Sequence, residues 1–131
     1  MNTRLVVIVL TAALSAAACA KHETAAQHDA DVAKAQADAS KDVANARAKA
    51  EEKVADAANA AGNTQRSVSG TVAKADEDVA ITAAKGAHKV ARERCERPNG
   101  DARKECERRA DADLDVAKAR AHQNEVASTP K

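Results

Sequence analysis

Three cysteines are the residues of this 131-residue chain best suited to covalent chemistry, and two of them flank one turn signal. Cys95 and Cys106 lie on either side of Pro98-Asn99-Gly100, and the midpoint between them falls inside that segment. Proline ends a helix and glycine accepts a left-handed turn, so two antiparallel helices joined there would carry both sulfur atoms at one height. A disulfide requires Cα atoms about 4.4–6.8 Å apart, which alanine-like neighbours allow. We therefore predict a Cys95–Cys106 disulfide that stabilises the hairpin by up to about 3 kcal/mol.

Metal binding and unpaired or intermolecular thiols are the alternatives for these two cysteines. Structural zinc sites usually have four cysteine or histidine ligands in closely spaced pairs. Neither Cys95 nor Cys106 has a second cysteine at that spacing. The histidines are scattered along the chain, at His22, His28, His88 and His122, and we expect each to be a surface residue and not a ligand. We predict no metal, cofactor or catalytic site, because the sequence offers no nucleophile with a nearby base and no phosphate-binding loop.

The first eighteen residues have the pattern of a secretory signal peptide. Met1–Arg4 is a short positively charged start, Leu5–Leu14 is largely apolar, and Ser15–Ala18 consists of small residues. This order of charged, apolar and small residues is typical of export signals. A permanent transmembrane helix needs about 20 apolar residues, more than this run supplies. The sequence therefore predicts a signal peptide over residues 1–18.

The predicted cleavage site has two interpretations. Ala16-Ala17-Ala18-Cys19 resembles the lipobox of bacterial lipoproteins, although Ala16 stands where leucine is commonest. In that family the cysteine becomes the mature N-terminus and carries acyl chains, which would anchor the protein to a membrane. The alternative is an A-x-A site, Ala18-Cys19-Ala20, that releases a soluble periplasmic protein. Lipidation of Cys19 would explain the odd number of cysteines, because it leaves one pair for a disulfide.

The residue after Cys19 suggests a location. In Gram-negative lipoproteins an aspartate at this position commonly signals retention at the inner membrane, whereas Ala20 occupies it here. The resemblance therefore implies sorting to the outer membrane, on its periplasmic face.

Alanine dominates the composition, at 36 positions, and the chain has no aromatic residue. Among the 113 residues from Cys19 to Lys131, only eleven are Val, Ile or Leu, which is too few for an ordinary hydrophobic core. Alanine has the best helix propensity, so the chain can be helical without being globular. Basic and acidic residues balance after Arg4 is set aside, and therefore no strong positive field would attract nucleic acid.

A repeat of eleven residues runs through the first half of the mature chain. A motif of the type Asp-Val-Ala-x-Ala-x-Ala begins at Asp31, at Asp42 and, more loosely, at Lys53, and it returns at Asp115. Eleven residues are three helical turns, so the valines fall on one line of a helix. The stripe contains one valine per three turns. It predicts either a weakly amphipathic helix or a specific helix–helix interface.

Two interruptions divide the chain into predicted segments. Gly62–Gly70 is rich in loop formers, and Pro98–Gly100 is a stronger stop. Thr24–Gln27 has the form of a capping box that would start a helix. We predict an all-α, elongated and partly disordered fold with helices over 28–61, 71–97 and 101–126. The domain organisation is then a signal peptide (1–18), a lipidated tether (19–27), a long repeat helix (28–61), a linker (62–70), a helical hairpin with its turn at 98–100 (71–126) and a disordered tail (127–131).

The segments on either side of the predicted Pro98–Gly100 turn are highly charged. Arg92–Arg97 and Asp101–Arg109 contain seven basic and five acidic residues. Glu93/Arg97 and Glu105/Arg109 have the i,i+4 spacing and order that stabilise a helix. A solvated, ion-paired surface is the expected interpretation, and a weak site for lipopolysaccharide phosphate or peptidoglycan carboxylate is the alternative.

Three resemblances bear on function. Residues Glu93–Ala121, with their Glu-Arg-Cys and Gly-Asp-Ala-Arg-Lys-Glu-Cys motifs, are similar to small alanine-rich envelope proteins of Gram-negative bacteria. The eleven-residue repeat resembles late-embryogenesis-abundant stress proteins, and the order of lipidated cysteine, helix and final Lys131 is similar to Braun-type lipoproteins linked to peptidoglycan. The first resemblance implies a location in the cell envelope. The alanine-rich helices and the lack of a catalytic motif predict a non-catalytic helical spacer or interaction module there, with a membrane, an envelope protein or peptidoglycan as partner. The other two imply a stress protectant or a peptidoglycan-linked lipoprotein.

Overall fold

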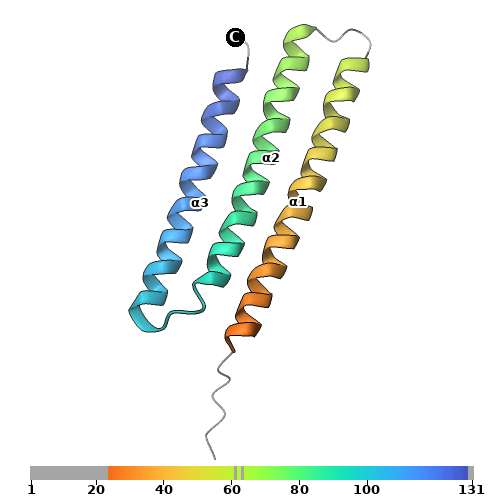
Figure 1. Ribbon diagram of the computed structural model, residues 1–131. Coiled ribbons are helices and arrows are strands. Elements are labelled where there is room, and N and C mark those ends of the chain that lie inside the picture. The colour runs from red at the N-terminus through yellow and green to blue at the C-terminus, as the bar shows by residue number, and fades with distance from the viewer. Residues whose placement is uncertain (1–23, 61, 63, 130–131) are drawn as a thin grey trace, which may run out of the picture.

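A computed structural model describes residues 24–60, 62 and 64–129, which form three α-helices (Figure 1). The helices are α1 (Ala25–Asn59), α2 (Gln65–Arg94) and α3 (Gly100–Ser128). No strand occurs within these described residues, so the predicted all-α fold is confirmed. The predicted signal peptide (1–18) and the predicted lipidation site, Cys19, lie outside them.

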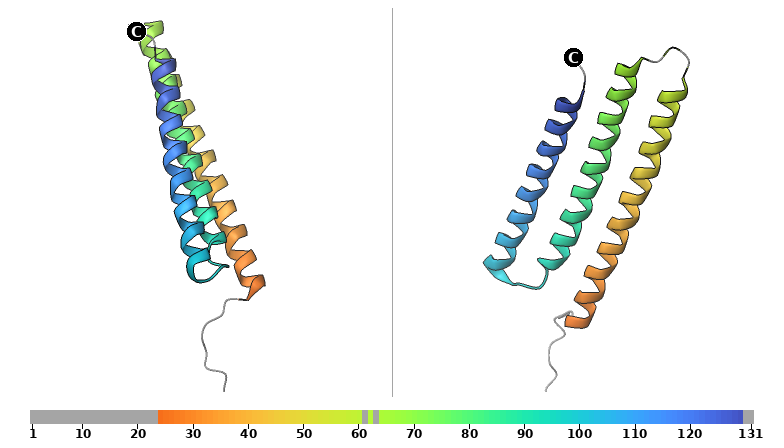
Figure 2. Two further views of the ribbon diagram at one scale, coloured as in Figure 1. Left: turned by 90° about the vertical axis from the view of Figure 1, so that its left-hand side faces the viewer. Right: turned by 45° about the horizontal axis from the view of Figure 1, so that its top comes forward.

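The three helices lie side by side in one layer. α2 packs against α1 on one side and α3 on the other, while α1 and α3 do not touch anywhere in the described part of the chain. Seen edge-on, the helices overlap in a thin antiparallel layer (Figure 2). With 35 residues, α1 is about 50 Å long at 1.5 Å per residue. The fold therefore has two separate helix interfaces instead of one central core.

The start of α1 is fixed by the predicted capping box. The Gln27 amide N–H donates to the Thr24 hydroxyl at 3.2 Å, and the Thr24 amide N–H donates to Gln27 Oε1 at 2.9 Å. This pair satisfies two backbone donors that a helix leaves free at its N-terminus. The helix consequently begins at Ala25, three residues earlier than predicted, and the predicted tether over 19–27 loses its last three residues to the helix.

The predicted linker over 62–70 is mostly wrong, because α2 already begins at Gln65. The Thr64 hydroxyl caps the helix by accepting the Ser67 amide N–H. The Ser69 and Thr71 hydroxyls donate to backbone carbonyls four residues earlier, at 2.9 and 3.0 Å. Hydroxyl residues favour loops when they compete for backbone groups, but here they cap the helix or bond back along it. The turn shrinks to a few residues around Gly62, whose φ of +89° favours glycine.

Both ends of the second turn also differ from the prediction. α2 ends at Arg94 instead of residue 97, because Pro98 lacks an amide donor and disfavours helical backbone before it. α3 begins at Gly100, whose φ is +62°.

At its C-terminal end α3 continues to Ser128, where the Thr129 amide N–H donates to the Glu125 carbonyl at 3.0 Å. The tail predicted as disordered from residue 127 is therefore helical in its first two residues.

The valine stripe of α1 forms the interface with α2. The less exposed positions of α1 follow each other at steps of four, three and four residues, which is the eleven-residue repeat. They are His28, Val32, Ala35, Ala39, Val43, Ala46, Ala50, Val54 and Ala57. Because α2 is the only helix that α1 contacts among the described residues, this face must be covered by α2. Of the two interpretations of the stripe, the structure supports a specific helix–helix interface.

The buried side chains are nearly all small. Those of the apolar kind are Ala35, Ala73, Ala75, Val90, Cys95, Ala110 and Ala121. α1 and α2 come close together at Gly86, where an added Cβ would lie 2.8 Å from the Ala39 Cβ. Small residues let the helix axes come close and so compensate for the missing large side chains.

Candidate functional site

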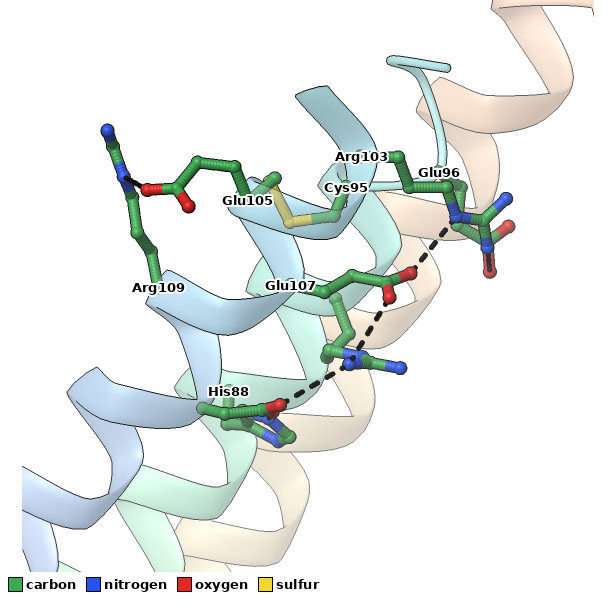
Figure 3. The surroundings of a disulfide bond; sticks show 10 residues. His88, Cys95, Glu96, Arg103, Glu105, Glu107 and Arg109 are labelled. Carbon is green, nitrogen blue, oxygen red and sulfur yellow. Dashed lines mark hydrogen bonds and ion pairs between the residues drawn. A yellow bond between two sulfur atoms is a disulfide. The ribbon is translucent and has the colours of Figure 1, made fainter. Parts of the chain in front are cut away.

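The Cys95–Cys106 disulfide joins α2 to α3 at the turn between them (Figure 3). The two Cα atoms are 5.5 Å apart, within the usual range for a disulfide. Cys95 directly follows the last residue of α2 and is fully buried, with 1% of its surface exposed. The predicted pairing is therefore confirmed, and neither cysteine is left as a thiol or a metal ligand in this structure.

Charged residues link α2 and α3 beside the disulfide. His88 Nε2 lies 2.7 Å from Asp111 Oδ1, and Arg92 lies between Asp111 and Glu107, at 3.7 and 3.8 Å. Arg103 of α3 pairs with Glu107 on its own helix at 3.0 Å (Figure 3). These pairs are partly exposed, so each contributes little alone, but they share partners and form a small network between the two helices.

The predicted i,i+4 pairs have different outcomes. Arg109 Nε donates to Glu105 Oε1 at 3.0 Å, as predicted. Glu93 and Arg97 do not share a helix face, because α2 ends at Arg94. Arg108 also donates two hydrogen bonds to Glu105, and these bonds, followed by that from Arg109, lower the pKa of the Glu105 carboxyl to about 2. Glu105 is therefore a strongly held anion on the surface of α3.

A second cluster lies toward the other end of the α2–α3 interface, and the sequence analysis missed it. Glu77 of α2 has only 6% of its surface exposed. Its carboxylate accepts a hydrogen bond from the Lys74 ammonium, and its Oε1 lies 3.2 Å from His122 Nδ1 of α3. Glu125 Oε2, one turn further along α3, lies 3.9 Å from the same nitrogen. The pKa of Glu77 is lowered, chiefly by the hydrogen bond from Lys74, whereas burial of the carboxylate acts in the opposite direction and raises it.

The register of the hairpin could have revealed this cluster. In an antiparallel pair of helices, facing residues have numbers with a constant sum. The sum is 201 for Cys95 and Cys106, and it is 199 for the pairs His88–Asp111, Arg92–Glu107 and Glu77–His122. Once the disulfide is accepted, its sum of 201 places Glu77 opposite Asn124, within one helical turn of His122, although 45 residues separate Glu77 from His122.

The sequence has two further histidines, His28 and His22, besides those in these two clusters. His28, expected at the surface, is buried at the start of the α1 interface. His22 lies outside the described residues.

A groove of about 470 Å³ lies between α1 and α2 on one face of the layer. Its charged lining residues are Asp42, Lys49, Lys53, Asp78, Lys85 and Lys89. The Lys53 ammonium pairs with Asp78 at 3.1 Å. Because lysines and aspartates are interspersed, the groove is an ordinary solvated surface with a modest positive excess.

Comparisons with known proteins leave the chain without an assigned family. No family model matches the sequence, and no curated protein or solved structure matches it significantly. None of the helices in the described ranges combines the length and the apolar character that crossing a bilayer requires.

Proposed function

We propose that this protein is a non-catalytic lipoprotein of the cell envelope that serves as a tethered helical spacer or interaction module. The observation that carries the proposal is the flat three-helix layer, closed at one turn by a disulfide. Such a layer provides length and two exposed faces, which suits a spacer. Catalysis commonly needs reacting groups held in a pocket that excludes water.

The location at the envelope has two supports of different kinds. Disulfides form and persist in oxidising compartments such as the bacterial periplasm. The signal-like segment before Cys19 supplies both an export route and a point of lipid attachment. In this proposal acyl chains on Cys19 hold the protein at the periplasmic face of the outer membrane, and the helices begin a few residues later. Release as a soluble periplasmic protein is the alternative location.

The stress-protectant hypothesis rests on the same eleven-residue repeat but predicts a different physical state. A protectant of that type gains helix only on drying or crowding, whereas a spacer is helical in dilute buffer. The continuous interface along α1 favours the spacer, because a transient helix has no need of matched contacts. A Braun-type link to peptidoglycan would use Lys131, which lies outside the described residues.

The tether is tested by labelling cells with a palmitate analogue. The wild-type protein should carry the label and fractionate with outer membranes, while Cys19→Ala should lose the label. Cys106→Ser is the matched control, because it removes another cysteine and should leave the label in place. An unlabelled wild-type protein would contradict the lipoprotein proposal.

The spacer is tested by circular dichroism and small-angle X-ray scattering of the Cys19→Ala protein in dilute buffer. We expect a strongly helical, elongated particle, about 50 Å long and about one helix thick in its thinnest direction. A chain with little helix that becomes helical only on dehydration would favour the protectant instead.

A further inference from the structure

We propose that Glu77, His122 and Glu125 form a binding site for a zinc-like divalent cation between α2 and α3. The site is independent of the tether at Cys19 and adds an activity to the proposed spacer. One imidazole and two carboxylates converge there from two helices.

The distances among the three side chains fit a small cation. Zinc binds nitrogen and oxygen ligands at about 2.0–2.2 Å, so two ligands of a tetrahedral site are about 3.3–3.6 Å apart. His122 Nδ1 lies 3.2 Å from Glu77 and 3.9 Å from Glu125, and all three ligand atoms lie within 4.8 Å of one another. A small rotation of the Glu125 side chain would bring its carboxylate from 3.9 Å to tetrahedral spacing from His122 Nδ1.

The chemistry of the donors selects the class of metal. An imidazole nitrogen suits zinc, copper and nickel, whereas calcium and magnesium prefer oxygen ligands alone. The His122 side chain is 68% exposed, so the side of the site away from Glu77 is open to water as a fourth ligand. Three protein ligands with an open fourth position are typical of accessible zinc sites rather than of closed structural ones.

Glu77 is what distinguishes this cluster from surface acidic groups. A carboxylate with 6% of its surface exposed needs a positive partner, and the Lys74 ammonium is the present one. The Lys74 side chain is itself mostly exposed and can move into solvent when a cation binds. Glu77 and Glu125 also line a groove, together with the polar residues Asp76, Asn124 and Ser128.

The same interface offers a matched control. His88 and Asp111 also pair across α2 and α3, at 2.7 Å. The third charged group in contact with Asp111 is the Arg92 guanidinium, where the His122 cluster has the second carboxylate of Glu125. Within the described residues, two histidine–carboxylate pairs thus join α2 to α3, and only that of His122 has a second carboxylate close enough to complete a ligand set for zinc.

The test measures Zn²⁺ binding to the full chain by calorimetry. Every protein carries Cys19→Ala, so that no thiol remains outside the disulfide to bind the metal. We expect one equivalent of Zn²⁺ to bind, with affinity about tenfold weaker or worse in His122→Ala and Glu125→Gln. His88→Ala should bind as tightly as the parent. Because His122 is exposed and Glu125 is near the end of α3, neither change should prevent folding, which circular dichroism verifies.

Nuclear magnetic resonance of the histidine rings gives an independent readout. One equivalent of Zn²⁺ should shift the ring nitrogens of His122 and leave those of His88 in place. The proposal would be overturned by a parent protein that binds no Zn²⁺ at 100-fold excess over protein, or by His122→Ala binding as tightly as the parent. Equal loss in His88→Ala and His122→Ala would overturn it as well.

Discussion

The two interfaces of α2 are stabilised by different kinds of interaction. Against α1, α2 presents alanines and Gly86, and one ion pair, Lys53–Asp78, crosses the interface in the described residues. Against α3, it has a disulfide, the His88 and Arg92 ion pairs and the Glu77 cluster. The first interface depends on close packing. The second depends on a covalent bond and on charge.

The same sequence motif behaves differently in the two partners of α2. In α1 the valines of the repeat lie on the covered face. In α3 the valine of the copy that begins at Asp115 is Val116, which is 50% exposed, and Val126 is also exposed. The motif alone therefore does not define an interface. The less exposed face of α3 instead carries Cys106, Ala110, Leu114 and Ala121, so the disulfide lies on this face and Val116 does not.

Reduction of the disulfide should have the largest effect and should act on one interface only. The eleven-residue separation closes a short loop, which in the chain-entropy model stabilises the fold by about 3 kcal/mol. The double change Cys95→Ser and Cys106→Ser should lower the free energy of unfolding by about that amount. Hydrogen exchange should accelerate in α3 much more than in the middle of α1.

An equal loss of protection in α1 and α3 would contradict this separation of the interfaces. The parent protein treated with a mild reductant provides the control for the serine substitutions themselves, and it should match the double variant.

Gly86→Ala should have the next largest effect, and it should act on the α1–α2 interface. The new Cβ would meet the Ala39 Cβ at 2.8 Å and its Cα at 3.3 Å, and neither atom can move without its helix. Overpacking costs about 1–3 kcal/mol, and the better helix propensity of alanine returns about 1 kcal/mol. We expect a net loss of stability of about 1 kcal/mol, measured by urea denaturation.

Gly70→Ala is the matched control on the same helix. Nothing lies within 4 Å of a Cβ added at Gly70, so this change should stabilise the protein by about 0.5–1 kcal/mol. If both alanine variants gained stability equally, α1 would not lie against Gly86 in solution.

Sequence reasoning succeeded where a local rule determines the structure. The Thr24 capping box, the turn at Pro98 and the disulfide all follow from residues close together in the chain. It failed over Gln65–Gly70, because the loop preference of serine and threonine is reversed when their hydroxyls bond to the helix backbone.

The packing of α1 on α2 and the Glu77 cluster could not be read directly from a local pattern. The repeat marked a face of α1 but not its partner, since alanine carries little information about what it contacts. Glu77 and His122 meet only through the hairpin register, which becomes known after the disulfide is placed.

Acid should weaken α3 through Glu105, and this should be the smallest of the predicted effects. The pKa of this carboxyl is lowered from 4.5 to about 2, chiefly by hydrogen bonds from Arg108 and then Arg109. A lowered pKa in the folded state means that the contribution to stability is complete above pH 4.5 and is lost as the pH falls toward 2. Because Glu105 is partly exposed, salt should reduce the effect.

The measurement is a titration of the Glu105 carboxyl carbon by nuclear magnetic resonance, together with thermal unfolding between pH 5 and pH 2. Glu105→Gln should abolish the part of the acid sensitivity that belongs to this residue, and the difference between parent and variant isolates it from the other carboxylates. Glu51→Gln, at an exposed position of α1, is the control that should leave the hydrogen exchange of α3 unchanged. A Glu105 midpoint near 4.5 would show that Arg108 and Arg109, which lie on the same helix, do not hold this carboxylate in solution.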